Sequence, residues 1–105
     1  MSGSGSGGWT PTSSSDKCAE LLFEAQLNSP QAEVLETLRL GEHLSVELSA
    51  LPRQVVQVVK NNSVVGAVTG SQTAQLISCL QNEYSFKAEV LSVNGGMCTI
   101  RVTPS

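Results

Sequence analysis

The sequence predicts a small, mainly β domain with two short helices, an α+β fold in which one sheet curls into a barrel. Apolar and polar residues alternate in several short runs, whereas only two stretches show helical spacing. Aromatic residues make up 4% of the chain, so aliphatic residues must form most of the core. A length of 105 residues with a low-complexity start leaves room for one domain.

The first 15 residues are rich in Gly and Ser. Such a segment cannot bury enough apolar surface to offset the entropy of ordering its backbone. We therefore predict a disordered tail over residues 1–17, whether native or a linker, and a single domain over residues 18–105. Trp9 either makes no contact in this tail or is an anchor that docks on the domain or on a partner.

Residues 20–27 alternate as a strand does, and a short helix follows them. The apolar positions of this strand share one face and are Leu21, Phe23, Ala25 and Leu27. Asn28 and Ser29 precede Pro30, an arrangement typical of a capped helix start, and apolar residues then recur at helical spacing up to Arg39. Gly41 lies where a helix commonly ends.

Three more strands and a second helix follow. Residues 43–51 alternate, and Pro52 ends the strand because proline removes a ladder donor. Residues 55–59 and 64–68 are almost wholly apolar, and the Asn61-Asn62 pair between them tolerates the positive φ angles of a tight turn. Gly66 and Gly70 mark close approaches and turns. Ser71 can cap the next helix, whose apolar positions are Ala74, Leu76, Ile77 and Leu80.

Residue parity sets the registers of the two hairpins. In the first hairpin a two-residue loop pairs Val59 with Val64 and Val55 with Val68, which predicts burial on both faces and a place at the centre of the fold. The last hairpin turns at Asn94-Gly95-Gly96, and a three-residue loop with a glycine bulge gives it apolar pairs. The pairs expected there are Val90 with Ile100, Ala88 with Val102 and Glu89 with Arg101.

The resulting order, β-α-β-β-β-α-β-β, suggests a small barrel with a helix closing one end. An open α+β sheet is the alternative.

Catalysis and metal binding are not predicted. His43, the one histidine, lies at a helix-to-strand junction, and no G-x-S-x-G nucleophile elbow is present. A zinc site would have to combine His43 with Cys18, Cys79 and Cys98, none of which forms a closely spaced pair. We interpret Cys79 and Cys98 as small buried hydrophobes, whereas Cys18 could be exposed and oxidisable. No cofactor is expected.

An odd number of isolated cysteines fits a reducing cytoplasm better than a disulfide-stapled secreted domain. No secretory signal is readable, and no run approaches the ~20 apolar residues of a membrane span. The sequence therefore predicts a cytoplasmic protein.

The formal net charge of −3 argues against non-specific binding to nucleic acid or acidic membranes. Residues 68–71 join a strand to a helix but lack the lysine of a phosphate-binding loop, which favours an ordinary capped turn. Lys87 and Arg101 share an outward face with Glu89, which favours a salt-bridge ladder. The residues predicted to bind a ligand are Arg53, Lys60, Tyr84, Lys87 and Arg101.

Residues 55–90 resemble the HIRAN domain. The resemblance rests on a strand, a short turn, an apolar-glycine step at Val65-Gly66, and a helix with small and leucine residues such as Ala74 and Leu76. It implies a small β-barrel that can hold the free hydroxyl end of single-stranded DNA. The Asn- and Asp-rich approach of that family is replaced here by residues 51–54.

Two functions follow from these observations. The favoured one is a non-enzymatic interaction module that binds a protein partner or a second copy of itself through a sheet edge or an apolar groove. The alternative is a HIRAN-like binder of single-stranded DNA, in which Tyr84 and Lys87 are the nearest candidates for contact.

Overall fold

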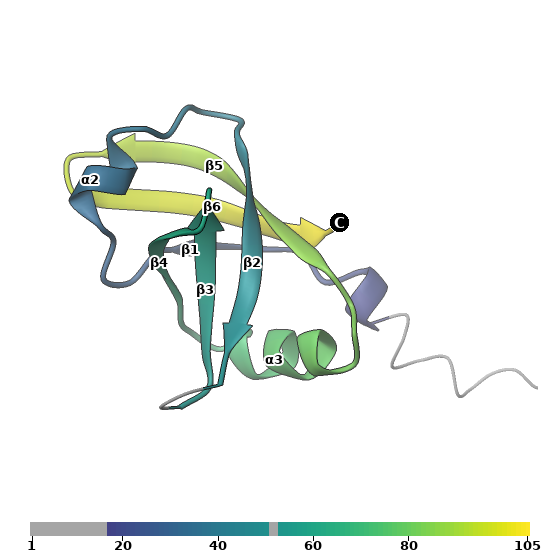
Figure 1. The fold of residues 1–105 in the computed structure, drawn as a ribbon. Coiled ribbons are helices and arrows are strands. Elements are labelled where there is room, and N and C mark those ends of the chain that lie inside the picture. Colours follow the sequence, from purple (N-terminus) through teal and green to yellow (C-terminus); the bar gives the residue numbers. More distant parts are fainter. Residues whose placement is uncertain (1–16, 51–52) are drawn as a thin grey trace, which may run out of the picture.

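The computed structural model describes residues 17–50 and 53–105 (Figure 1). Residues 1–16, and Trp9 with them, lie outside the described residues. The elements are β1 (Phe23–Gln26), α2 (Ala32–Leu35), β2 (His43–Ser49), β3 (Val55–Lys60), β4 (Ser63–Val68), α3 (Thr73–Gln81), β5 (Phe86–Asn94) and β6 (Met97–Pro104). Residues 17–19 are also helical. The predicted mainly β fold and the predicted order of its elements are confirmed.

Six antiparallel strands form one sheet in the order β1-β6-β5-β2-β3-β4. The sheet curls until its edge strands meet beside Asn28 (Figure 1). There the Asn28 N–H donates to the Ala67 carbonyl at 2.8 Å, and the Ala67 N–H donates to the Asn28 carbonyl at 2.9 Å. One bridge therefore joins the two edges of a half-barrel.

Gly66 permits this close approach. A Cβ at that position would lie 3.0 Å from Leu27 Cβ and 3.2 Å from the Asn28 carbonyl oxygen. Because both neighbours belong to the opposite edge, a side chain at position 66 would push the two edges apart. The expectation that Gly66 marks a close approach is confirmed.

The core lies inside the curl and under α3. Its largest fully buried side chains are Leu76, Ile100, Val56, Val58, Val65, Val68, Val90 and Val102. They come from the apolar faces of β3 to β6 and of α3, so the predicted alternation positions the core as expected. Figure 1 shows α2 and α3 at opposite ends of the sheet. We call these the α2 end and the α3 end.

The β3–β4 hairpin is predicted correctly at its turn and wrongly farther along. Asn61 and Asn62 have φ angles of 51° and 69°, and Val59 pairs with Val64. The register then shifts, so Val68 pairs with Val56 instead of Val55. The shift leaves Val65 as an extra residue, which bends β4 toward β1.

The predicted central place of this hairpin is also wrong. β3 and β4 lie at one end of the strand order, and β5 and β2 occupy its middle. Burial on both faces is incomplete, since Val64 is 37% exposed and Val55 is partly exposed. The sheet curls around one interior, so only one face of each strand lines the core.

In the β5–β6 hairpin, by contrast, the predicted pairs are correct and the predicted turn is wrong. All three expected pairs are present: Val90 with Ile100, Ala88 with Val102 and Glu89 with Arg101. The predicted three-residue loop is wrong, because Asn94 pairs with Met97 across a two-residue turn. The extra residue is Leu91, where the register shifts between Val90 and Ser92. A bulge within the strand bends β5 and keeps the same parity as a bulge in the loop.

Both predicted helix caps are wrong. Asn28 bonds to Ala67 instead of capping, and α2 begins after Gln31, which makes no side-chain cap. Likewise α3 begins after Gln72, while the Ser71 hydroxyl donates to the Gln72 side chain at 3.1 Å. α3 itself is confirmed, whereas α2 has only four residues of the longer helix expected.

Candidate functional site

A pocket of about 580 Å³ opens between α3 and the chain at Lys17. We call it the α3 groove, and its lining residues are Lys17, Cys18, Gln75, Ser78, Cys79, Asn82 and Tyr84. Its floor contains the buried Cys18 and Cys79, and its rim carries side chains that are exposed. Apart from Lys17, the lining residues carry no charge at neutral pH.

The spacing of α3 builds one wall of the groove. Gln75, Ser78 and Asn82 follow one another at three and four residues, so they share a face of the helix. The Asn82 side-chain N–H donates to the Ser78 carbonyl at 2.9 Å, which leaves the amide oxygen of Asn82 as an acceptor.

Tyr84 forms another wall because the chain turns back after α3. Glu83 has a φ of 70°, and the Tyr84 N–H donates to the Cys79 carbonyl at 3.1 Å. The Tyr84 ring is partly buried and packs against the core. An aromatic ring thus stands beside neutral amide side chains.

A disulfide between Cys18 and Cys79 ties the first described residues to α3. The two Cα atoms lie 5.6 Å apart, within the usual range for a disulfide, although 61 positions separate them in sequence. Cys79 is buried as predicted but bonded, and Cys18 is oxidised, as the sequence allowed, but buried instead of exposed. The interpretation of Cys98 as a small buried hydrophobe is confirmed, since its thiol is free and buried. Burial raises the pKa of the Cys98 thiol.

The disulfide bears on two other predictions. The cytoplasmic prediction rested partly on the lack of a recognisable cysteine pair, and the disulfide removes that part of its support. The zinc set loses two ligands, and within residues 17–50 and 53–105 no three His, Cys, Asp or Glu side chains gather as a metal site would require. No described helix is long and apolar enough to cross a membrane.

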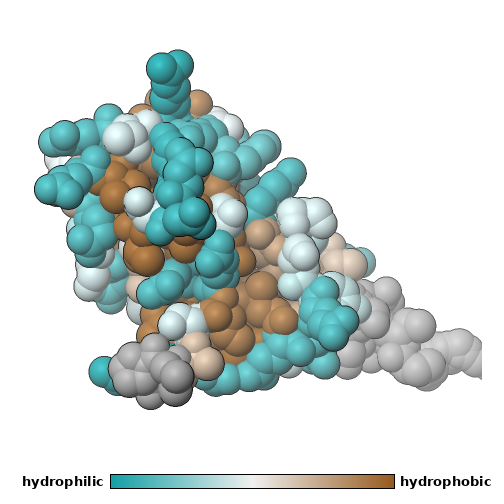
Figure 2. Space-filling model, viewed as in Figure 1, coloured by the Kyte–Doolittle hydropathy of each residue, from teal (hydrophilic) through white to brown (hydrophobic). Residues whose placement is uncertain are grey.

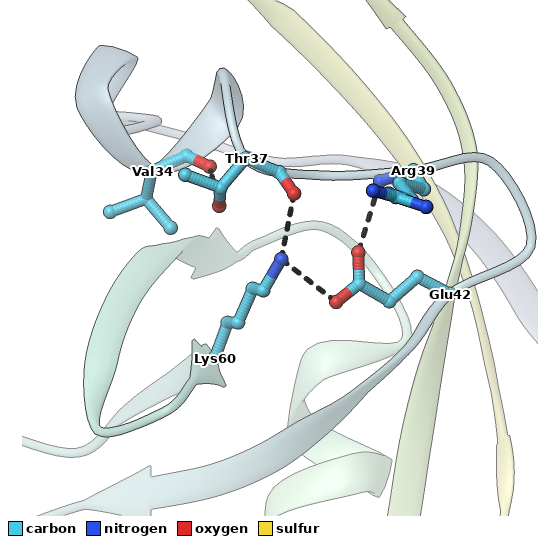
Figure 3. A network of polar contacts seen from close by, with 5 residues as sticks. All are labelled: Val34, Thr37, Arg39, Glu42 and Lys60. Carbon is cyan, nitrogen blue, oxygen red and sulfur yellow. Dashed lines mark hydrogen bonds and ion pairs between the residues drawn. The ribbon is translucent and has the colours of Figure 1, made fainter.

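Lys60, a predicted ligand-binding residue, is engaged at the α2 end (Figure 3). Its ammonium group donates to the Thr37 carbonyl at 2.7 Å and lies 2.9 Å from a carboxylate oxygen of Glu42. The other carboxylate oxygen of Glu42 accepts the backbone N–H of Arg39 at 3.0 Å. We call these contacts the Lys60 network. They fasten the loop after α2 to the end of β3.

The network holds the pKa of the Glu42 carboxyl below its ordinary value of 4.5. The hydrogen bond from Lys60 is the main cause, and the N–H of Arg39 adds to it, because both stabilise the charged carboxylate. Lys60 therefore has a structural partner in Glu42, directly before β2.

Arg101 lies between two carboxylates. Its guanidinium is 3.2 Å from Glu24 on β1 and 3.7 Å from Glu89 on β5. This confirms the predicted pairing of Glu89 with Arg101 and extends it across three strands. Lys87 is on the same strand as Glu89, and Arg53 is exposed before β3.

The structure therefore brings together few of the predicted site residues. Tyr84 alone lines the α3 groove, while Lys60 and Arg101 pair with carboxylates elsewhere. The missed residues are Lys17, which precedes the predicted domain, and the polar face of α3. The helical spacing of Gln75, Ser78 and Asn82 was visible in the sequence, but polar residues at such spacing usually mark a face of a helix that is exposed to solvent.

Apolar surface is also visible over β2, β3 and α3, bordered by hydrophilic residues (Figure 2). The apolar residues of these elements that remain partly exposed include Leu48, Val55 and Ile77. Strongly exposed large apolar side chains lie apart in sequence and are Leu22, Leu40, Val64 and Met97.

Comparisons with known proteins give no relative: no family model, no curated protein and no solved structure matches this chain.

Proposed function

We propose that this chain is a non-enzymatic module that binds a protein partner, and that the α3 groove receives a segment of that partner. The observation that carries the proposal is the lining of the groove, in which Tyr84 stands beside the neutral side chains of Gln75, Ser78 and Asn82. Amide and hydroxyl groups can bond a peptide backbone, and tyrosine contributes large contact area at interfaces.

The distribution of charge supports a protein partner over a nucleic acid. Two of the four cations expected to contact a ligand, Lys60 and Arg101, already pair with carboxylates. A phosphate-binding surface needs several free cations close together, because phosphate contacts dominate affinity for nucleic acid. The partly exposed apolar residues of β2, β3 and α3 add contact area suited to protein.

The groove is a better candidate than the sheet edge for the binding surface. The chain just after β1 already pairs with β4 through the Asn28–Ala67 bridge, so some backbone groups at the β4 edge are already bonded. Strand addition needs a free row of backbone donors and acceptors.

A photo-crosslinking residue at position 75, inside the groove, tests the proposal in the organism that makes the protein. A crosslinker at Gln81, exposed on α3 but outside the groove lining, is the matched control. We expect one protein to be captured from position 75 only, and Ser78→Arg to abolish its capture. Equal capture from both positions, or none, would contradict the proposal. Capture of a second copy of this chain would show that the chain is its own partner and forms a homodimer.

The second candidate is HIRAN-like binding to the end of single-stranded DNA. The observation that favours it is the position of Tyr84 beside Lys17 in an open pocket, since an aromatic ring and a cation can stack a base and contact a phosphate. Labelled oligonucleotides titrated at low and high salt test this candidate. Binding that strengthens at low salt and is lost in Tyr84→Ala would support DNA; absence of binding at low salt would exclude it.

A further inference from the structure

We propose that the α3 groove binds the side chain of Trp9 of the same chain, so that the N-terminal segment occupies the binding site until a partner displaces it. The proposal rests on the groove being the binding site proposed above. It adds that Trp9 of the same chain occupies the groove and competes with the partner for it.

The starting point of the described chain argues for this occupant. The described chain begins at Lys17, and Lys17 itself lines the groove. Lys17, to which the N-terminal segment is attached, therefore lies at the groove. Trp9 precedes Lys17 by eight positions, enough chain to reach ~28 Å when extended and to fold back over the adjacent groove.

Covalent attachment makes even weak docking effective. A short flexible connection gives an effective concentration on the order of millimolar. An indole that binds the groove with a Kd of ~1 mM is then bound about half of the time.

The chemistry of the groove suits an indole. The ring can pack on Tyr84 and on the sulfurs of the Cys18–Cys79 disulfide, and aromatic rings make favourable contacts with both kinds of group. The amide oxygen of Asn82, whose N–H is held by Ser78, can accept the indole N–H. The ammonium of Lys17 can lie over the ring face. Trp9 is the single tryptophan of the chain and the one aromatic residue of the first 16.

Fluorescence of the intact chain tests the proposal directly, since the sequence has one tryptophan and one tyrosine. Tyr84 lines the groove, so docking places the energy donor beside the acceptor. We expect energy transfer from Tyr84 to Trp9, an emission of Trp9 shifted to the blue of N-acetyl-tryptophanamide, and quenching by acrylamide weakened about two-fold at half occupancy.

Two variants localise the effect. Ser78→Arg fills the groove and should restore free-tryptophan emission and quenching. Ala74→Arg places the same side chain on an exposed site of α3 outside the groove lining and should change neither. Circular dichroism checks that both variants fold.

Emission and quenching equal to the free amide, without energy transfer, would overturn the proposal even if Ser78→Arg fails to fold. Protection that persists in a folded Ser78→Arg chain would also overturn it, since Trp9 would then dock elsewhere. So would protection that appears only at high protein concentration, which indicates docking between chains.

The failure of this inference is separable from failure of the proposed function. If Trp9 competes with the partner, Trp9→Ala should raise capture by the crosslinker at position 75. Unchanged capture in Trp9→Ala would reject competition while the partner site stands. No capture in either chain, with Trp9 still protected, would reject the partner site and leave the docking.

Discussion

The two ends of the curled sheet are fastened by different chemistry. At the α2 end, the Lys60 network joins β3 to the loop after α2 through an ion pair and hydrogen bonds (Figure 3). At the α3 end, a disulfide joins the first described residues to α3. Acid weakens the ion pair at the α2 end, and a reductant breaks the disulfide at the α3 end. At the α2 end the charged side chains of Lys60 and Glu42 are paired with each other, whereas the groove beside the disulfide at the α3 end is lined mainly by neutral side chains.

Breaking the disulfide should have the largest effect. Replacing Cys18 and Cys79 together by Ser should lower the free energy of unfolding by about 4 kcal/mol, since the bond closes a long loop in the unfolded chain. Urea denaturation of the oxidised wild type and the double variant measures the difference. Amide exchange should accelerate in α3 and stay unchanged in the loop after α2. Equal stability of the two chains would show that the bond contributes little at this end.

The close approach between the two edges of the sheet comes next. Gly66→Ala should lower the free energy of unfolding by about 2 kcal/mol, because the added methyl group would crowd Leu27 and the Asn28 carbonyl. Gly96→Ala is the matched control, since a Cβ there meets nothing within 4 Å. Its effect should stay within about 0.5 kcal/mol. Similar losses in both variants, measured by urea denaturation, would remove Gly66 from its role in closure.

Acid should loosen the α2 end selectively. The pKa of Glu42 is lowered by folding, so its contribution to stability is fully present above 4.5 and is lost as the pH falls through the folded value. Glu42→Gln should therefore destabilise the chain at pH 7, and the difference from wild type should shrink toward pH 3. Thermal unfolding at both pH values tests this. Glu47→Gln, on the exposed side of β2, is the control, and a pH-dependent loss of the same size there would refute a specific role for Glu42.

The ladder at Arg101 should matter least. Arg101→Gln removes contacts to Glu24 and Glu89, but the Arg101 side chain is 39% exposed. Exposed ion pairs contribute about 0–1 kcal/mol, so the loss should lie within that range and shrink in high salt. Urea denaturation at two salt concentrations checks it. A loss above this range, unaffected by salt, would mean that Arg101 acts by packing.

The strands and α3 were predicted well because the residues that indicate each of them are close together in the sequence. The Asn61-Asn62 turn and the alternation of Phe86, Ala88 and Val90 each depend on neighbouring residues alone. Parity also predicted the Val90–Ile100 register, since a one-residue slip would bury polar side chains. The sequence did not show which residue forms the bulge that shifts the register. A bulge at Leu91 and a bulge in the loop satisfy the same parity.

The helix caps and the site were missed for another reason. Asn28 has the side chain of a cap, but its backbone pairs with Ala67, which is distant in sequence. Cys18 and Cys79 likewise carry no local sign of their bond. Of the α3 groove, Tyr84 was proposed from its type as an exposed aromatic, whereas Lys17 joins the site only because the disulfide holds the chain there.

The sequence by itself determined the element order, the inward face of most strands, the first hairpin turn and the burial of Cys98 in the core. These features follow from the side-chain period of strands and helices and from the φ preferences of turn residues. The tertiary structure decided where the strands bulge, that the edges meet at Asn28 and Ala67, which cations are neutralised and where the groove opens. Those outcomes depend on contacts between residues far apart in the chain, which form only once the sheet has curled.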